Sequence, residues 1–536
     1  MDLIRISNVS LALDQGAREL LRAVARKLGT MEENIRSYRV VRQSVDARNK
    51  ENIRFVYTVD VEVAKNPKGL LAKHRTNPHL KEVQPFRYQP PQAGVEPLGC
   101  RPVVVGAGPA GIFAALTLAR QGYRPLVLER GQDVDTRTKD VAHFWAAGEL
   151  NLDSNVQFGE GGAGTFSDGK LTTRIDDPRV EVVLATLVEA GAPEEIGFMQ
   201  KPHVGTDILR RVVTNLRQEL VALGGEVRFG AMVTGLLVEQ GRLRGVVANG
   251  GQEVEAEVVV MATGHSARDT YQALHQAGVE LQAKPFAMGV RIEHPQGLID
   301  QAQYGSMAGH PKLGAADYHL TYQNKEAGRA AYTFCMCPGG QVVAAASEAG
   351  RVVTNGMSDF ARDSGVANSA LVVSVEPKDF GGTHPLAGME FQQDWEDRAY
   401  RAGGGGYKAP AQTVGDFLAG RPGSDLEGLG TYRPGLTPVD LHSCLPTYVS
   451  AILEEAIVDM DRRLRGFNSA QAVLTGIETR TSAPVRIIRG EDRQAIQMEG
   501  LYPAGEGAGY AGGIVSAAVD GIKTAEKIIS RFQKGD

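Results

Sequence analysis

The chain has few cysteines and few aromatic residues, and these shortages exclude several classes of protein. Four cysteines in 536 residues are too few for the disulfide framework of a small secreted scaffold. They are Cys100, Cys335, Cys337 and Cys444. Aromatic residues make up 6% of the chain, which argues against a surface built to stack nucleic-acid bases. The cysteines and histidines show no metal-ligand spacing, so we expect no metal site.

The sequence also lacks a long hydrophobic run and a leader-like start. No stretch of 18 apolar residues occurs, so we expect no membrane span. The first residues, MDLIRISNVSLALDQG, carry an early Asp and have no basic region followed by an apolar core, so we expect no signal peptide. The composition is 42% hydrophobic and 23% charged, which is typical of a globular protein, and we expect a cytoplasmic location.

Acidic residues are scarce in the first part of the chain, and basic residues are scarcer than acidic ones in the rest. Residues 1–88 hold 17 Lys and Arg against 10 Asp and Glu, whereas the remainder holds 41 against 53, for a net charge of −5. A basic first segment can bind an acidic ligand or nucleic acid, or it can dock on an acidic domain and keep the chain soluble. The net negative charge and the absence of an RNA-binding signature argue against a nucleic-acid partner.

Residues 101–131, RPVVVGAGPAGIFAALTLARQGYRPLVLERG, are the most informative stretch. Apolar runs at 103–105 and 126–128 predict two buried strands, with a glycine turn and a helix between them. The second run ends in Glu129, about 20 residues after the turn. The glycines of the turn are Gly106, Gly108 and Gly111. Strand, glycine turn, helix, strand and acid together are the dinucleotide-binding fingerprint.

Each part of this fingerprint has a physical role. Gly106 permits the tight turn, Gly108 lets the backbone approach a pyrophosphate, and Gly111 lets the helix pack on the sheet. The helix N-terminus presents free N–H groups and a partial positive charge to phosphate. Glu129 is placed to accept hydrogen bonds from the adenosine ribose. We therefore predict a bound dinucleotide.

The remaining segments differ in composition and in hydrophobic periodicity. Residues 2–63 predict a β-α-β-β unit, and the prolines of 64–100 predict an extended connector. Residues 158–174, FGEGGAGTFSDGKLTTR, predict a ligand-facing loop, because five glycines cannot form a stable helix or central strand. Residues 226–260 predict a β-meander of four short strands. Residues 291–469 mix strands with Gly/Pro-rich stretches and predict a substrate domain or lid.

The expected fold class is therefore α/β with α+β parts, in which a Rossmann-type domain is interrupted by a β-meander and a mixed substrate domain. We expect four segments: a basic N-terminal domain with its linker, the first part of the dinucleotide-binding domain, the substrate domain and the C-terminal part of the dinucleotide-binding domain. Their expected ranges are 1–90, 91–290, 291–469 and 470–536.

These motifs together resemble FAD-dependent oxidoreductases of the glutathione-reductase-like class. Within it the chain resembles a family of largely uncharacterised bacterial NAD(FAD)-utilising dehydrogenases, over nearly its whole length. Besides the loop at 158–174, the motifs are KPHVGTD (201–207), ATGHSARD (262–269), KPFAMGVRIEHP (284–295), FCMCPGG (334–340), ETRTSAPVRI (478–487) and YPAGEGAGYAGG (502–513). The resemblance implies an oxidoreductase with non-covalent FAD, but no settled substrate.

The resemblance also implies which residues hold FAD. Gly505-Glu506 corresponds to a Gly-Asp pair on the ribityl chain, and the extra methylene of Glu moves the carboxylate by about 1.5 Å. A helix beginning near Gly513 would point its N-terminus at the flavin N1–C2 edge, where negative charge gathers on reduction. The implied cofactor-binding residues are Gly106, Gly108, Pro109, Ala110, Gly111, Glu129, Arg130, Gly161, Gly162, Gly164, Thr165, Val233, Ala262, Thr263, Gly264, Gly505, Glu506, Gly512, Gly513 and Ile514.

Two features of related enzymes are missing from the sequence. No redox cysteine pair follows the glycine turn, and Cys335-x-Cys337 lies on a predicted strand where both side chains face the same side. That pair is either a thiol site near the flavin or two small packing residues. No second strand–GxGxxG–helix–strand–acid unit follows, so NAD(P)H is expected as a transient donor at most, without a dedicated domain.

The sequence names no catalytic residue firmly. His203, Lys170 and Cys337 are candidates, and Lys170 and Asp168 could also position an anionic or carbonyl substrate; each could equally be structural. We expect hydride transfer between a small-molecule substrate and flavin N5. Two alternatives stay open: an FAD-dependent protein that binds or modifies RNA through its basic N-terminal domain, and a non-catalytic flavin redox sensor.

Overall fold

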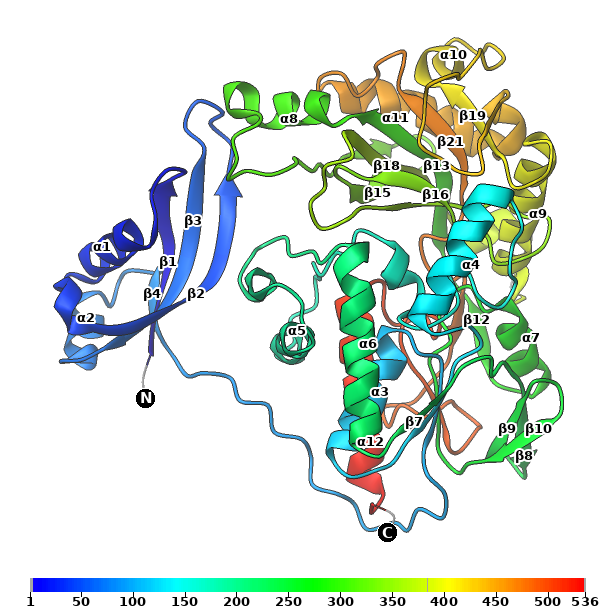
Figure 1. Cartoon of the computed structure of the whole chain (residues 1–536), viewed down its shortest axis with the longest axis horizontal. Coiled ribbons are helices and arrows are strands. Elements are labelled where there is room, and N and C mark those ends of the chain that lie inside the picture. The colour runs from blue at the N-terminus through cyan, green and yellow to red at the C-terminus, as the bar shows by residue number, and fades with distance from the viewer. Residues whose placement is uncertain (1–2, 383, 535–536) are drawn as a thin grey trace.

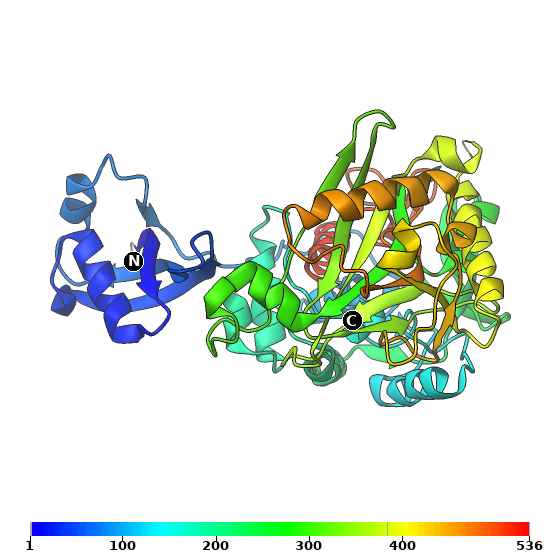
Figure 2. The same ribbon diagram turned by 90° about the horizontal axis from the view of Figure 1, so that it is seen from above.

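The computed structural model describes residues 3–382 and 384–534, which fold into three parts. Figure 1 shows a small N-terminal domain at one side, a part built on a parallel sheet, and a part built on a large antiparallel sheet. Seen from above, the N-terminal domain stands beside the two larger parts (Figure 2). The mixed α/β class expected from the sequence is confirmed.

The N-terminal domain is a four-stranded antiparallel sheet with two helices. Its order along the chain is β1 (Leu3–Ala12), α1 (Ala17–Leu28), β2 (Ile35–Asp46), β3 (Arg54–Val63), α2 (Pro67–Lys73) and β4 (Leu80–Val83). The strands are arranged β2-β3-β1-β4, which is the ferredoxin-like βαββαβ topology. The predicted β-α-β-β unit is thus incomplete: α2 and β4 lie in the segment expected to be an extended connector. Asn66 caps α2 by accepting from the N–H of Gly69, which fixes a helix despite the prolines nearby.

Backbone hydrogen bonds attach this domain to the rest of the chain at two places. The tail of the linker pairs with the end of the C-terminal helix, since the N–H of Gly94 donates to Ile529 O at 2.8 Å. At the other end, the N–H of Gln43 on β2 donates to Phe198 O at 2.7 Å, and the N–H of Gln200 donates back to Gln43 O at 2.8 Å. The domain is therefore held by its β2 strand as well as by its linker.

A five-stranded parallel sheet forms the base of the molecule. Its order is β23-β11-β5-β6-β7, so segments from both ends of the region beyond the linker meet side by side. The strands are β5 (Val103–Val105), β6 (Leu126–Leu128), β7 (Glu226–Arg228), β11 (Val259–Met261) and β23 (Leu501–Pro503). Helix α3 (Pro109–Arg120) and helix α12 (Ile514–Arg531) pack against one another, and Gly521 permits this because a Cβ there would lie 2.1 Å from Ala110 O.

The predicted four-strand meander is wrong at both of its ends. Three strands, β8 (Val233–Glu239), β9 (Arg242–Ala248) and β10 (Gln252–Glu255), form a separate antiparallel sheet. The first predicted run became β7 of the parallel sheet, and the last run divides into β10 of the small sheet and β11 of the parallel sheet. Short apolar strands of both kinds have the same composition, so periodicity alone could not separate them.

The third part is a seven-stranded sheet with the order β14-β15-β18-β13-β21-β19-β20. Its strands are β13 (Phe286–Pro295), β14 (Thr321–Asn324), β15 (Arg329–Cys337), β18 (Val366–Val375), β19 (Ala409–Thr413), β20 (Leu436–Pro438) and β21 (Val473–Glu478). Because β13 and β21 both pair inside this sheet, its limits lie at 286 and 478 rather than at the expected boundaries of 291 and 469.

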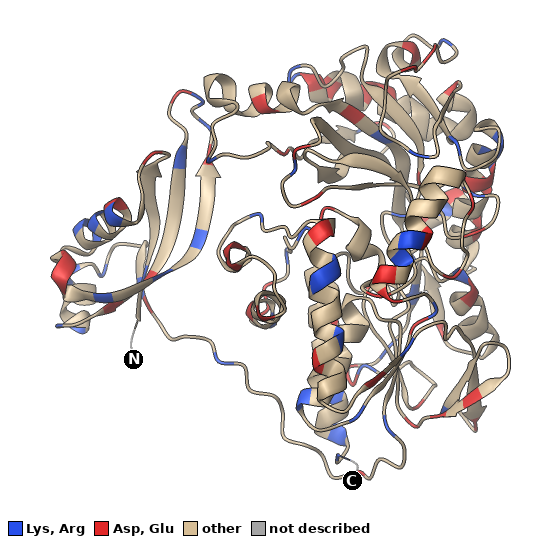
Figure 3. Ribbon diagram, viewed as in Figure 1, with Lys and Arg blue, Asp and Glu red and all other residues tan. Residues whose placement is uncertain are grey.

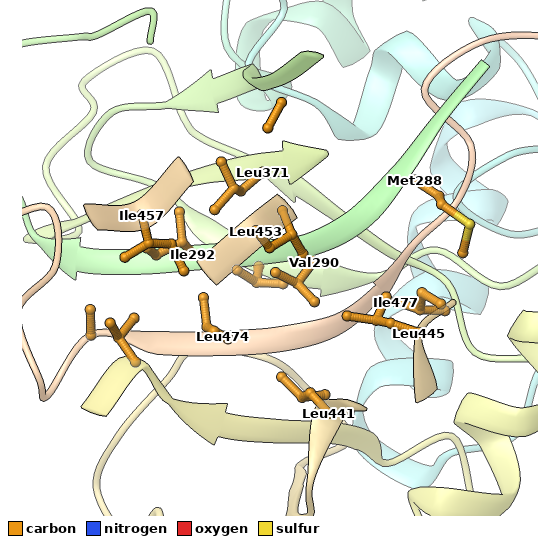
Figure 4. Close-up of a cluster of buried hydrophobic side chains, with 14 of the residues drawn as sticks. Met288, Val290, Ile292, Leu371, Leu441, Leu445, Leu453, Ile457, Leu474 and Ile477 are labelled. Carbon is orange, nitrogen blue, oxygen red and sulfur yellow. The ribbon is translucent and has the colours of Figure 1, made fainter. Parts of the chain in front are cut away.

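A hydrophobic core fixes this sheet against helix α11 (Thr447–Asp461). Figure 4 shows Leu453 and Ile457 of α11 above Val290 of β13 and Leu474 of β21. All four are fully buried, and each contributes on the order of 1.5–3 kcal/mol. Helix α9 (Ala387–Ala402) lies in a stretch that its glycines and prolines marked as irregular, so it was not expected.

The remaining elements connect these parts. They are α4 (Val134–Ala147), α5 (Arg179–Glu189), α6 (Thr206–Ala222), α7 (Arg268–Gln276), β12 (Leu281–Ala283), α8 (Gln296–Tyr304), β16 (Gln341–Ala344), β17 (Thr354–Met357), α10 (Val414–Leu418) and β22 (Val485–Ile487). Short 3₁₀ turns occur at Glu32–Asn34, Gly162–Phe166, Glu194–Gly197, Gly305–Met307, Pro377–Phe380 and Leu441–Cys444.

Candidate functional site

One cavity of about 350 Å³ joins the parallel sheet to the seven-stranded sheet. Its near end is formed by the glycine turn after β5 and by Glu129 after β6. Its middle is lined by the segment 262–266 and by Glu506, and its far end by the loop 164–172 together with residues of β15, β17 and β21. The carboxyl ends of parallel strands open into this cavity, which is where ligands bind in such sheets.

At the near end, Glu129 is held by three backbone N–H groups. Its Oε2 accepts from Ala107 at 2.7 Å, and its Oε1 accepts from Gly131 and Gly159, each at 2.9 Å. The side chain is 5% exposed. A carboxylate has about four acceptor positions, so the fixed group keeps capacity for a ligand hydroxyl.

The near end and the middle fit a dinucleotide on geometric grounds. No side chain caps the N-terminus of α3 or of α12, so both helix ends keep backbone N–H groups for a ligand. A Cβ added at Gly264, Gly512 or Gly513 would meet no atom within 4 Å, so these backbones border open space. Both observations match a phosphate held at one helix end and a further polar group held at the other.

Sixteen of the residues expected to hold FAD line this cavity: Gly106, Gly108, Pro109, Ala110, Glu129, Arg130, Gly162, Gly164, Val233, Ala262, Thr263, Gly264, Glu506, Gly512, Gly513 and Ile514. Four others lie behind the wall. Gly111 faces the turn, since a Cβ there would lie 1.9 Å from Gly106 O. Gly161 and Thr165 border a smaller apolar space between α3 and α6, and the N–H of Gly505 donates to Asp520 at 2.8 Å. Their role in binding the cofactor stays a prediction.

In the middle of the cavity, Glu506 faces His265. The Glu506 Oε1 and His265 Nε2 atoms lie 4.0 Å apart. Burial raises the pKa of Glu506 to about 7, although Lys284 opposes this. Burial, followed by the charges of Arg480 and Arg268, lowers the pKa of His265 to about 3. The imidazole is therefore neutral at pH 7, while the carboxyl group sits near its midpoint.

At the far end, Asp168 and Lys170 line the cavity together, from the predicted loop. Asp168 is 1% exposed and accepts hydrogen bonds from Arg362 Nε at 2.9 Å, Arg362 Nη2 at 2.5 Å and the Ser358 hydroxyl. Lys170 Nζ lies 3.5 Å from Asp168 Oδ2. Burial alone would raise the pKa of Asp168, but Lys170 and Arg362 hold it below its usual value.

Two further ion pairs reach the cavity wall from the seven-stranded sheet. Arg291 Nε donates to Glu478 Oε2 at 3.0 Å, with both groups buried. Arg480, just beyond β21, donates to Glu396 on α9 at 3.0 Å. Arg268 on α7 binds the same Glu396 at 2.7 Å, so this carboxylate joins the two larger parts of the molecule.

The three catalytic candidates lie in different surroundings in the structure. Lys170 lines the cavity, but His203 and Cys337 do not. His203 Nε2 lies 3.0 Å from Phe360 O, and Cys337 is fully buried with its pKa raised to about 12 by burial. The side chains of Cys335 and Cys337 do not share one face as expected, because β15 has a bulge between Phe334 and Cys337 and Cys335 adopts φ 46°. Cys335 is therefore the cysteine that lines the cavity.

Several cavity residues were not singled out from the sequence as cofactor or catalytic positions. They include Gln157, Phe158, Ser266, Phe334, Asn355 and Glu478. Phe334 and Asn355 lie on strands that the sequence marked only as part of a substrate domain, whereas Glu478 falls in the segment expected to be the C-terminal part of the FAD-binding domain. The motif FCMCPGG carried a signal for Phe334 and Cys335, but no pattern marked Asn355.

Comparison with known families bears directly on this site. A family model described as FAD-dependent protein, C-terminal domain-like, matches residues 285–481, nearly the limits of the seven-stranded sheet. A model described as NAD(P)-binding Rossmann-like domain matches residues 104–157, and a domain of unknown function matches residues 3–62. A protein of Clostridium beijerinckii described as uncharacterized is 52% identical over 99% of each chain. The chain belongs to a family of FAD-dependent oxidoreductases. This confirms FAD, the cofactor that the resemblance implied, and agrees with the dinucleotide expected from the glycine turn and the acid.

Two named relatives match over shorter stretches. A digeranylgeranylglycerophospholipid reductase of Haloferax volcanii is 33% identical over 31% of this chain and 35% of that protein. Protein FixC of Escherichia coli is 28% identical over 42% of this chain and 52% of that protein.

Two negative findings apply to residues 3–382 and 384–534. No helix among them is long and apolar enough to cross a membrane. No group of three or more His, Cys, Asp or Glu residues among them is placed to hold a metal ion.

Proposed function

We propose that this FAD-dependent oxidoreductase transfers hydride between a small-molecule substrate and flavin N5. When bound, FAD supplies the hydride-accepting and hydride-donating chemistry. The observation that supports this proposal is the single cavity that continues from the dinucleotide end at Glu129, past Glu506, to the polar far end at Lys170. A cofactor and a second molecule can meet there within one cavity.

The residues of the chain have distinct tasks in this proposal. Glu129 and the uncapped N-terminus of α3 would hold the AMP half of FAD, and Glu506 would contact its ribityl chain. The uncapped N-terminus of α12 would lie near the part of the flavin where negative charge collects, and its partial positive charge would favour the reduced form. The far end orients the substrate and, with Phe334, keeps water from the reacting atoms.

Electrons enter or leave through a small molecule in this proposal. The described residues contain one strand–glycine turn–helix unit, and this proposal assigns that unit to FAD. We therefore propose NAD(P)H only as a donor that binds transiently, without a domain of its own. The partial match to a reductase supports reduction as a reaction class and no more than that. The four free cysteines favour a reducing compartment such as the cytoplasm.

The experiment that tests the proposal follows the absorbance of oxidised flavin without oxygen. NADH, NADPH and a panel of metabolites are added one at a time to the FAD-loaded protein. A compound that bleaches the flavin at a rate comparable with turnover, followed by reoxidation with a second compound, supports the oxidoreductase. Flavin that no compound reduces at a useful rate favours the redox sensor instead.

The RNA alternative receives support from charge alone. Figure 3 shows basic residues along α1 and β2 of the N-terminal domain. The aromatic side chains of its sheet, Tyr38, Phe55 and Tyr57, pack in its hydrophobic clusters, so they do not form an exposed stacking platform. Arg5 and Arg39 both pair with Asp60 on the same sheet.

A further inference from the structure

We propose that the far end of the cavity binds the carboxylate of an organic acid, with Lys170 providing the positive charge. This assignment rests on the proposed function, since it names the substrate class of the same site. Two observations support this assignment: the balance of charges around Lys170, and the hydrogen-bond donors that line the far end of the cavity with it.

The position of Lys170 is set by its backbone. Residues 169–171 pair with residues 202–204: the N–H of Leu171 donates to Pro202 O at 2.9 Å, and the N–H of Val204 donates to Gly169 O at 3.1 Å. The side chain is 28% exposed and lines the cavity. A flexible side chain therefore starts from a fixed point in the backbone and reaches into the cavity.

The positively charged side chains of Arg362 and Lys170 both lie beside the carboxylate of Asp168. Asp168 is already bound by both Nε and Nη2 of Arg362 and by the Ser358 hydroxyl. Lys170 Nζ, at 3.5 Å, adds a second positive charge and donates no hydrogen bond to any residue among 3–382 and 384–534. The group of Asp168, Arg362 and Lys170 therefore carries one positive charge in excess, and Lys170 is its cavity-facing member.

The other charged groups at this end are balanced within the protein. Glu478 is paired with Arg291 at 3.0 Å. Arg480 and Arg268 share two carboxylates, Glu396 and Glu348. The excess charge of Lys170 is thus left for a ligand, and its effect is larger in an enclosed site than in water. One positive charge matches a carboxylate, whereas a phosphate dianion would need more.

Neutral donors and an apolar wall complete the binding surface. Asn355 accepts from Arg291 Nη2 at 3.1 Å through Oδ1, which leaves its Nδ2 without a partner among the described residues. Asn355 and Thr172 both line the cavity, as does the apolar ring of Phe334. An organic acid would place its carboxylate at Lys170 and Asn355, with its apolar part near Phe334.

The test uses the FAD-loaded protein and two probes of the same shape. Benzoate and its uncharged analogue benzamide are each titrated against the protein while the visible spectrum of the flavin is recorded. We expect benzoate to shift the spectrum saturably and to bind about tenfold or more tightly than benzamide. Lys170→Met removes that preference, Lys170→Arg restores most of it, and Lys139→Met, an exposed control on α4, leaves it unchanged.

The outcomes separate this assignment from the proposed function. A yellow protein that binds both probes equally or neither, or a Lys170→Met variant that keeps its benzoate affinity, overturns the carboxylate site alone. A colourless protein that takes up no FAD overturns the proposed function and this assignment with it. Equal FAD content and circular dichroism in all variants exclude misfolding as the cause of a loss.

Discussion

The Glu129 carboxylate accepts a hydrogen bond from the backbone N–H of Gly159 at 2.9 Å, and this bond joins the strand β6 to the glycine-rich loop. The same side chain binds Ala107 in the glycine turn. One carboxylate thus holds together two segments that a dinucleotide must contact, so its loss affects the site even before any cofactor is considered.

Replacing this carboxylate with an amide should weaken both the fold and the cofactor site. In Glu129→Gln, one oxygen acceptor becomes an N–H donor that faces backbone N–H groups, which leaves at least one buried donor unpaired. We expect a loss of about 1–3 kcal/mol in the free energy of unfolding of the apoprotein, measured in urea, and at least tenfold weaker FAD binding. The exposed control Glu253→Gln should change neither. Wild-type stability in Glu129→Gln would contradict the structural role of the three hydrogen bonds.

Two glycines of the cofactor site should respond oppositely to the same substitution. A Cβ at Gly111 would lie 1.9 Å from Gly106 O, whereas a Cβ at Gly512 would meet nothing within 4 Å. We expect Gly111→Ala to unfold at clearly lower urea concentration, by about 2 kcal/mol or more, because helix α3 must move off the glycine turn. Gly512→Ala should keep the stability of the apoprotein within about 0.5 kcal/mol and reduce FAD affinity instead. The measurements are urea unfolding and FAD titration of both variants.

Sequence patterns predicted the first part of the site because its chemistry is local. The glycine turn, Glu129 and the loop at 158–174 lie within 75 residues of one another and carry fixed spacing. The far end could not be predicted in the same way, because Lys170, Asn355 and Glu478 come together only when β17 and β21 fold against the loop. Helix α9 was hidden by neighbouring glycines and prolines.

In the N-terminal domain, too, an element that depends on long-range pairing could not be predicted from the sequence. Strong alternation gave β1 and β3, but β4 has four residues and was recognisable only through its pairing with β1. Its partner contact, such as Lys81 opposite Arg5, spans more than 70 residues. A proline-rich stretch therefore concealed an element that completes the sheet.

Neutralising Glu396 should loosen the junction of the two larger parts. This fully buried carboxylate pairs with Arg268 and with Arg480, and the attraction of both guanidinium groups keeps its pKa below the usual range although burial opposes this. In Glu396→Gln, two buried guanidinium groups lose their shared counter-charge. We expect a loss of about 3–5 kcal/mol in the free energy of unfolding, and a lower FAD content after purification.

The control for this variant lies on the same helix. Glu390→Gln changes an exposed residue of α9 and should shift the unfolding midpoint little. Comparable losses in the two variants would show that helix α9 tolerates no change of charge at all, and would remove the special role of the buried pair. Differential scanning calorimetry and urea unfolding both report the difference.

The raised pKa of Glu506 gives the apoprotein a stability that depends on pH. Burial lifts this pKa from 4.5 to about 7, so between these values the folded chain keeps a proton that the unfolded chain has released. Since the folded state then binds more protons, the contribution of this group to the free energy of unfolding falls as the pH rises through this window and is constant above it. Glu506→Gln cannot titrate and should not show this fall. Urea unfolding of the apoprotein and the variant across the window measures the difference between the two curves, and parallel curves would mean that the carboxyl group is solvated in the cavity as it is in water.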